Sequence, residues 1–241
     1  MDSESLISIG EAAIRLGVSI DTLRRWDKSG KLPAIRKNNI RYYLKKDVDV
    51  FLNELSIIAF DWAFAGTATE IPRMFYCQDS SVFQARLAKM QDAFIAASIQ
   101  NNILFLLVAI TGEIGNNSFD HNLGNWLDVP GIFFGYDVNK REIVLADRGQ
   151  GLLKTLQRVK INLNNYKDAL NTAFTESISG RSPENRGNGL KFVRKSVLSN
   201  PIDLFYQSGD YQLEITRQVN SMEIKKSKQF IRGCMAIIKF Y

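Results

Sequence analysis

Several polar side chains stand at spacings that could hold a phosphate-bearing ligand. Glu113 and Asn117 lie four residues apart in a segment with helical periodicity, so both would face the same side of a helix. Asp147 follows a predicted strand and begins the pattern Asp-x-Gly-x-Gly, in which Gly149 and Gly151 would let the backbone come close to a ligand. Taken separately, an exposed helix and an ordinary two-glycine turn would explain these features.

A third element is the stretch from Ala173 to Leu190, which is rich in Ser, Gly, Pro and Arg and precedes a predicted helix. Gly187 and Gly189 stand where that helix would begin, and free N–H groups and the helix dipole favour anions at such a place. A disordered surface loop before a capped helix would explain the composition. It would not explain why the three elements occur together.

In this order and spacing, residues 100–241 resemble the GHKL ATPases, the superfamily of gyrase, heat-shock chaperones, histidine kinases and mismatch-repair proteins. The resemblance implies an α/β sandwich that binds ATP and Mg²⁺. Asn117 would hold the metal, and Asp147 would accept a hydrogen bond from the adenine amino group. Gly149 and Gly151 would make room for the base. The second glycine box and the loop over the phosphates would comprise Arg181, Arg186, Gly187, Gly189 and Leu190.

The resemblance leaves hydrolysis and phosphotransfer open. In hydrolysing members the carboxylate that matches Glu113 activates the attacking water, which is a general-base role. Anti-sigma serine kinases keep a similar carboxylate, and a helix-capping or loop-pairing role would need no catalysis at all. His121 is the single histidine and lies within the predicted binding helix, with no histidine upstream, so sensor histidine autokinase activity is disfavoured.

The N-terminal part of the chain carries an excess of positive charge. Between Ser19 and Lys46 there are nine basic and two acidic residues, although the whole chain carries a net charge of only +6. Such a density of Arg and Lys is typical of a protein that contacts a phosphate backbone. A solvated helix face would be the simpler explanation if the charges stood alone.

The pattern around these charges predicts two helices and a basic hairpin. The first helix would end at Gly17, and Ser19 would cap the second. Two short strands would follow around an Asn38-Asn39 turn, and a further helix would begin near Lys45. This plan is that of a winged helix-turn-helix. A helical protein-interaction module is the alternative.

Residues 6–55 closely resemble the DNA-binding domain of MerR and excisionase-like regulators. In that family the second helix enters the major groove, and the hairpin grips the backbone or the minor groove. The resemblance therefore implies DNA contacts from outward-facing residues, namely Thr22, Arg24 and Arg25 on the helix and Arg36, Lys37 and Arg41 on the hairpin.

The sequence as a whole predicts an α+β protein with a winged helix-turn-helix at residues 1–55 and a GHKL sandwich at 100–241, built on a mixed sheet with helices on one face. Residues 56–99 would form a linker with a helical docking or dimerisation segment. The longest apolar run, 103–110, is too short to span a membrane, and the acidic N-terminus lacks a signal-peptide pattern, so we expect a cytoplasmic protein. One histidine and two distant cysteines cannot build a classical zinc site.

We therefore expect a regulator, working as a homodimer, in which Mg-ATP controls the binding of DNA or of a protein partner. ATP would order the segment Glu176–Asn188, and the apolar segment Ser56–Phe64 would transmit the change to the head. An ATPase or a protein Ser/Thr kinase recruited by its head is the alternative. A third option is a domain that binds nucleotide without turnover.

Overall fold

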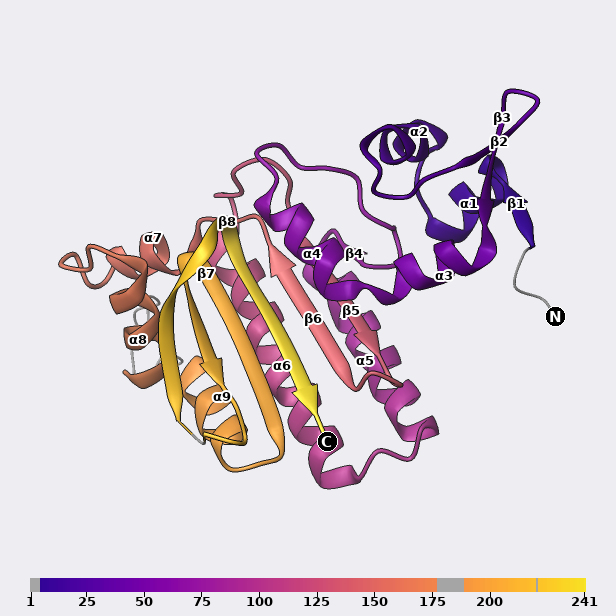
Figure 1. Cartoon of the computed structure of the whole chain (residues 1–241). Helices are drawn as coiled ribbons and strands as arrows, with labels where there is room; N and C mark the ends of the chain where they lie inside the picture. The colour runs from indigo at the N-terminus through magenta and orange to yellow at the C-terminus, as the bar shows by residue number, and fades with distance from the viewer. Residues whose placement is uncertain (1–4, 177–188, 220) are drawn as a thin grey trace.

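The computed structural model describes residues 5–176, 189–219 and 221–241 (Figure 1). We call residues 5–53 the head and the described residues from 55 onward the body. The head contains β1 (Leu6–Ser8), α1 (Ile9–Leu16), α2 (Ile20–Ser29), β2 (Ile35–Lys37), β3 (Ile40–Leu44) and α3 (Lys45–Asn53). The body contains α4 (Leu55–Phe64), β4 (Tyr76–Cys77), α5 (Ser80–Ala96), α6 (Asn101–Asn122), β5 (Ile132–Asp137), β6 (Glu142–Asp147), α7 (Gly151–Gln157), α8 (Tyr166–Thr175), α9 (Gly189–Leu198), β7 (Ile202–Ile215) and β8 (Met222–Phe240).

The head has the predicted helix-turn-helix and hairpin. The side chain of Ser8 and that of Glu11 form a capping box at the start of α1, and Gly17 ends this helix with a φ of 63°. Asn38 and Asn39 both take positive φ at the hairpin turn, which is the geometry of a type I′ turn. Strand β1 was not predicted; it pairs with β3 and makes the order β1-β3-β2.

The body is built on a sheet with the strand order β4-β5-β6-β8-β7, which confirms the α+β class. Each of the pairings in the described part of the chain is antiparallel, whereas a mixed sheet was expected. The reason is that β5 and β6 form a hairpin, as do β7 and β8, and β8 then joins the two hairpins by pairing with β6.

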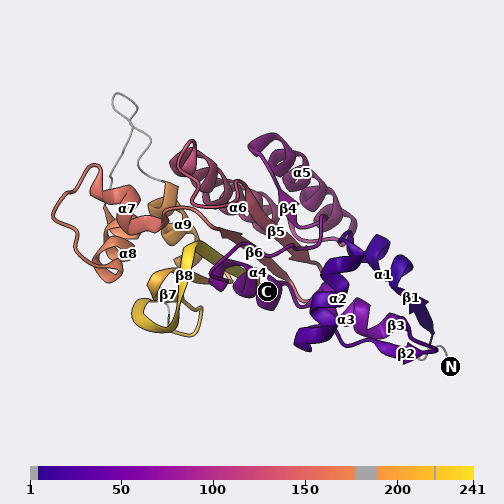
Figure 2. The ribbon, with the colours of Figure 1, turned by 90° about the horizontal axis from the view of Figure 1, so that it is seen from above.

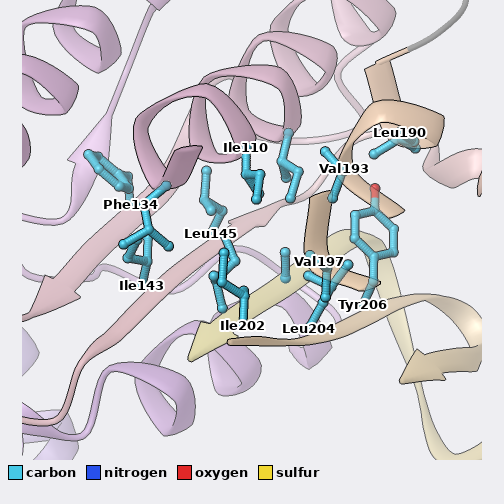
Figure 3. Close-up of a cluster of buried hydrophobic side chains, with 14 of the residues drawn as sticks. Ile110, Phe134, Ile143, Leu145, Leu190, Val193, Val197, Ile202, Leu204 and Tyr206 are labelled. Atoms are coloured by element: carbon cyan, nitrogen blue, oxygen red, sulfur yellow. The ribbon is translucent and has the colours of Figure 1, made fainter. Parts of the chain in front are cut away.

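Helices cover both faces of this sheet, although the sequence predicted helices on one face. Helices α5, α6 and α9 pack on one side, and α4 lies on the other (Figures 1 and 2). The alternation of side chains along the strands supplies both cores. Ile143 and Leu145 face α6 and α9, as Figure 3 shows, whereas Val144 and Ala146 face α4.

The body begins earlier in the chain than predicted. Residues 56–99 were expected to form a separate linker and docking segment, but β4 is a strand of the sheet and α5 packs into the same core as α6. Phe83 of α5 occupies the space that a side chain at Gly115 of α6 would need, because a Cβ there would lie 2.1 Å from its ring. Helix α4 is the part that docks, and Leu55, Ile58 and Trp62 are its buried anchors.

The C-terminal strands β7 and β8 pair along most of their length, with a register shift near Ser208 and Gly209. Gly209 has a φ of 62°, and a Cβ there would lie 2.5 Å from the ring of Tyr166 on α8. Helices α7 and α8 were not predicted. Among the described residues, no helix combines the length and the apolar character that a membrane span requires.

Candidate functional site

A pocket lies where α6, the end of β6 and the start of α7 meet. It contains four of the residues that the sequence singled out, namely Asn117, Asp147, Gly151 and Leu190, together with His121. The remaining lining residues are Ser118, Asn122, Leu152, Thr155, Tyr206 and Cys234. Leu190 and Tyr206 also belong to the core shown in Figure 3, so the pocket rests directly on packed side chains.

Asp147 carries the only carboxylate among the described residues that line this pocket, and it is buried. The Ser118 hydroxyl donates to its Oδ2 at 2.8 Å, and the Gly149 N–H donates to its Oδ1 at 2.8 Å. Burial raises the pKa of Asp147 to about 6, although these hydrogen bonds work to lower it. The pocket therefore holds an acceptor that is charged at neutral pH and poorly solvated.

Two residues that the sequence analysis missed hold Asp147 in place. Asn122 donates to Oδ1 of Asp147 at 3.4 Å, and its own side-chain oxygen accepts from the Gln150 N–H at 2.9 Å. Ser118 and Asn122 are four residues apart on α6, which places both on the side facing β6. The spacing of this polar pair was the available signal, although several other polar residues occur in the same half of α6.

Gly149 was predicted to make room for a base. In the structure, a Cβ at Gly149 would lie 2.1 Å from the side-chain amide of Asn122. The glycine thus makes room for the residue that orients Asp147. Gly151 needs the backbone freedom of glycine, because its φ is 74° at the first position of α7.

Glu113 and Asn117 share one face of α6 beside the first residue of α9, as their spacing predicted. A Cβ on Gly189 would lie 2.4 Å from Oε2 of Glu113 and 3.6 Å from Nδ2 of Asn117. Asn117 lines the pocket, whereas Glu113 is exposed and stands outside its lining. Arg181, Arg186 and Gly187 lie outside the described residues.

The side chains near Asn117 determine which metal ion could bind there. Within the part of the chain that is described, His, Cys, Asp and Glu side chains form no group of three that could hold a metal ion. The Asn117 side-chain oxygen is a suitable ligand for Mg²⁺, which keeps several waters and is usually completed by substrate phosphates. Mg²⁺ would therefore bind beside Asn117 only together with a ligand that supplies further oxygen atoms, such as those of phosphate groups.

Arg148 connects the pocket to the opposite face of the sheet. Its side chain is fully buried and points away from Asp147, toward α4. The guanidinium donates to the Trp62 carbonyl, and its Nη2 and Nε donate to Oδ2 of Asp128 at 2.5 and 3.1 Å. The sequence analysis missed this bidentate pair because Asp128 lies twenty residues away in an irregular segment.

The outward face of α2 differs from the prediction at one position. Arg24 is exposed and pairs with Asp21 at 2.8 Å, and Arg25 donates to the Thr22 hydroxyl at 2.9 Å. Thr22 was expected to face outward, but it is buried, and its hydroxyl donates to the carboxylate of Glu70 from the segment after α4. Periodicity within α2 could not predict that Thr22 is buried, because the residue that covers it, Glu70, lies forty-eight positions further along the chain.

The hairpin is anchored to α2 through Asp27. Arg41 Nε and Arg36 Nη2 donate to Oδ2 of Asp27 at 2.7 and 3.1 Å, and the Ala34 N–H donates to Oδ1 at 3.0 Å. The hydrogen bond from Arg41, followed by that from Ala34, lowers the pKa of Asp27 to about 2. Arg41 thus serves first to hold the hairpin, whereas Arg36 and Lys37 keep most of their surface exposed.

Two comparisons with known proteins bear on the head. A family model described as MerR family regulatory protein matches residues 8–43. The type II methyltransferase M.Eco47II of Escherichia coli is 42% identical over 57 residues, which make up 23% of this chain and 14% of that protein. The chain thus spans only a small part of this curated relative. Residues 8–43 thus match a MerR-type helix-turn-helix, and the helices and hairpin of the head agree with this family match.

Proposed function

We propose that the body binds Mg-ATP in the Asp147 pocket and that nucleotide occupancy controls how the head binds DNA. The observation that carries the nucleotide assignment is the buried, hydrogen-bonded carboxylate of Asp147. An anionic acceptor in a largely apolar recess suits the exocyclic amino group of a purine base. The resemblance of residues 100–241 to the GHKL ATPases supports the same assignment.

The position of Asn117 supports the phosphate end of the proposal. Asn117 lies one helical turn before His121 and lines the same pocket as Asp147, and it stands next to Gly189 at the start of α9. Mg²⁺ would neutralise the charge of the phosphates when it is bound. Asn117 would hold the ion and phosphate oxygens would complete its coordination, while Glu113 would stand beside them.

A route from the pocket to the head supports the proposed control. Arg148 follows Asp147 in the chain and binds the Trp62 carbonyl in the last turns of α4. Helix α4 follows α3 of the head with only Glu54 between them. A shift of the Asp147–Gly149 turn on nucleotide binding would therefore reach α4 and, through it, the orientation of the head.

The exposed carboxylate of Glu113 favours a second candidate, an ATPase or a protein Ser/Thr kinase recruited through its head. A general base must lie within hydrogen-bond reach of the hydroxyl or water it activates. Glu113→Gln should then abolish turnover of ATP while leaving its affinity unchanged. If the chain turns over no ATP, this second candidate is wrong, and the proposal of a regulator controlled by nucleotide binding is unaffected.

Calorimetry on the full chain tests the nucleotide half of the proposal. We expect saturable, one-site binding of ATP in the presence of Mg²⁺, and we expect Asp147→Asn to weaken it strongly. Fluorescence anisotropy with labelled duplex DNA tests the other half, and we expect binding that weakens steeply with added salt. Absence of ATP binding would contradict the pocket assignment, and absence of DNA binding at low salt would contradict the role of the head.

A further inference from the structure

The segment between α4 and β4 returns to the head and contacts the start of α2 (Figure 1). Its Glu70 carboxylate accepts hydrogen bonds from the Ser19 N–H and the Ser19 hydroxyl, both at 3.0 Å, and from the Thr22 hydroxyl. Ser19 is the residue that caps α2. One carboxylate from the body segment thus takes up three donors at the N-terminal end of this helix.

A second contact three residues later fastens the same segment. The Arg73 N–H donates to the Gly17 carbonyl at 3.3 Å, in the turn between α1 and α2. The carbonyls of Arg73 and Met74 accept from the Arg86 guanidinium on α5, at 2.7 and 2.6 Å. Residues 70–74 are therefore bonded both to the helix-turn-helix and to the body, and we call them the strap.

The end of α2 that the strap covers is the end that a helix-turn-helix applies to DNA. The first residues of the second helix contact base edges, and backbone N–H and hydroxyl groups of this kind bind phosphate oxygens. Here those donors already have an anionic partner, and the negative charge of Glu70 would repel a phosphate at the same place. Arg25, which donates to the Thr22 hydroxyl, is drawn into the same cluster.

We propose that the strap is an intramolecular clasp, in which Glu70 occupies the DNA-facing end of α2 and must leave before the head can bind DNA fully. This inference rests on the proposed DNA binding of the head. Release is structurally simple, because the strap lies in a segment without helix or strand between α4 and β4. Its hold on Arg86 would keep the segment attached to the body after Glu70 has left.

The charge state of Glu70 fits a clasp that is closed at neutral pH. Burial works to raise the pKa of Glu70, but the hydrogen bonds from Thr22 and Ser19 outweigh it and leave the pKa below its ordinary value. Among the described residues, the charged side chain of Arg25 faces this carboxylate and also lowers its pKa. The carboxylate is therefore ionised at neutral pH and competes with a phosphate for the same donors.

The first test compares two variants that change the net charge equally. Glu70→Gln weakens the clasp, whereas Glu214→Gln removes a carboxylate that pairs with Lys225 between β7 and β8 of the body. We expect Glu70→Gln to raise the affinity of the full chain for duplex DNA by about five-fold or more, and Glu214→Gln to stay close to wild type. Equal effects of the two variants, or weaker DNA binding by Glu70→Gln alone, would overturn the clasp.

A reversible cross-link provides a second test that does not depend on removing Glu70. A Cβ on Gly17 would lie 3.2 Å from the Cβ of Arg73, so a separation of about 3.8 Å, typical of a disulfide, needs only a small shift. Because Gly17 has positive φ, Gly17→Cys is strained, and the reduced Gly17→Cys/Arg73→Cys protein serves as its own reference. We expect oxidation to weaken DNA binding at least five-fold and a reductant to restore it.

The two tests separate the clasp from the proposed function. If the oxidised and reduced double variant bind DNA with the same affinity as each other, the clasp is wrong and DNA binding stands. If wild type, Glu70→Gln and the reduced double variant all fail to bind duplex DNA at low salt, the proposed function of the head is wrong and the clasp with it.

Discussion

The hydroxyl of Ser118 on α6 donates a 2.8 Å hydrogen bond to Oδ2 of Asp147 at the end of β6. This bond fixes the helix that carries Asn117 against the strand that carries the buried acid, so the two ends of the candidate ligand site belong to one rigid unit. Catalytic and binding groups are best held in this way, by elements whose own side chains are locked by hydrogen bonds.

The burial of Asp147 predicts a specific pH dependence of stability. The carboxyl is protonated in both states below its ordinary pKa of 3.8, but between this value and about 6 only the folded protein holds the proton. The free energy of unfolding of wild type should therefore fall relative to Asp147→Asn as the pH rises from about 3 to about 7, by about 3 kcal/mol in all. Urea unfolding at several pH values measures this difference, and parallel curves for the two proteins would contradict the burial of a charged group here.

Asn117→Ala should abolish binding of Mg-ATP and leave the fold intact, because it removes a metal ligand from the pocket wall and little core volume. Asn116→Ala is the matched control, since Asn116 accepts a hydrogen bond from Gln84 at 2.8 Å outside the pocket. Calorimetry should show wild-type affinity in the control and no detectable binding in Asn117→Ala. Unchanged affinity in Asn117→Ala would show that the metal assignment is wrong.

Removal of Asp128 should be costly for the body. Asp128→Ala leaves the fully buried guanidinium of Arg148 without its anionic partner, and breaking a buried ion pair in this way costs about 3 kcal/mol or more. Asp21→Ala, which breaks an exposed pair with Arg24, should cost less than about 1 kcal/mol. Chemical denaturation measures both, and equal losses would mean that the Arg148 pair contributes no more than a surface contact.

The hairpin should contribute to DNA binding mainly through phosphate contacts. Replacing both Arg36 and Lys37 by Ala should lower the slope of log affinity against log salt by about two, whereas replacing Arg24 and Arg25 should weaken binding itself. Lys226→Ala with Lys228→Ala removes the same charge from β8 and should leave the slope unchanged. A slope unaffected by the hairpin variant would argue that the head contacts protein instead of DNA.

Local signals in the sequence predicted most of the head and the main elements of the pocket. Gly17, Ser19 and the Asn38-Asn39 turn fixed the helix-turn-helix and hairpin, because capping and positive φ are short-range requirements. The spacing of Glu113 and Asn117, and the strand before Asp147, placed these residues on the elements that they occupy.

The features that the sequence did not reveal all depend on contacts between distant residues. Glu70 covers Thr22, Arg148 pairs with Asp128, and the amide of Asn122 fills the space beside Gly149. The packing of α4 on the second face of the sheet was not predicted, for a similar reason. The apolar sequence of α4 shows that this segment is buried, but it does not show which surface it packs against. Periodicity reports which face of an element is buried and says nothing of its partner.

Control of the head by nucleotide in the Asp147 pocket is tested most directly by the affinity of the full chain for duplex DNA, measured with and without Mg-ATP. We predict a several-fold change in affinity, which needs only about 1 kcal/mol of coupling, and no change in Asn117→Ala. If saturating Mg-ATP binds and leaves both the DNA affinity and the oligomeric state of wild type unchanged, the pocket does not control the head and the account is contradicted.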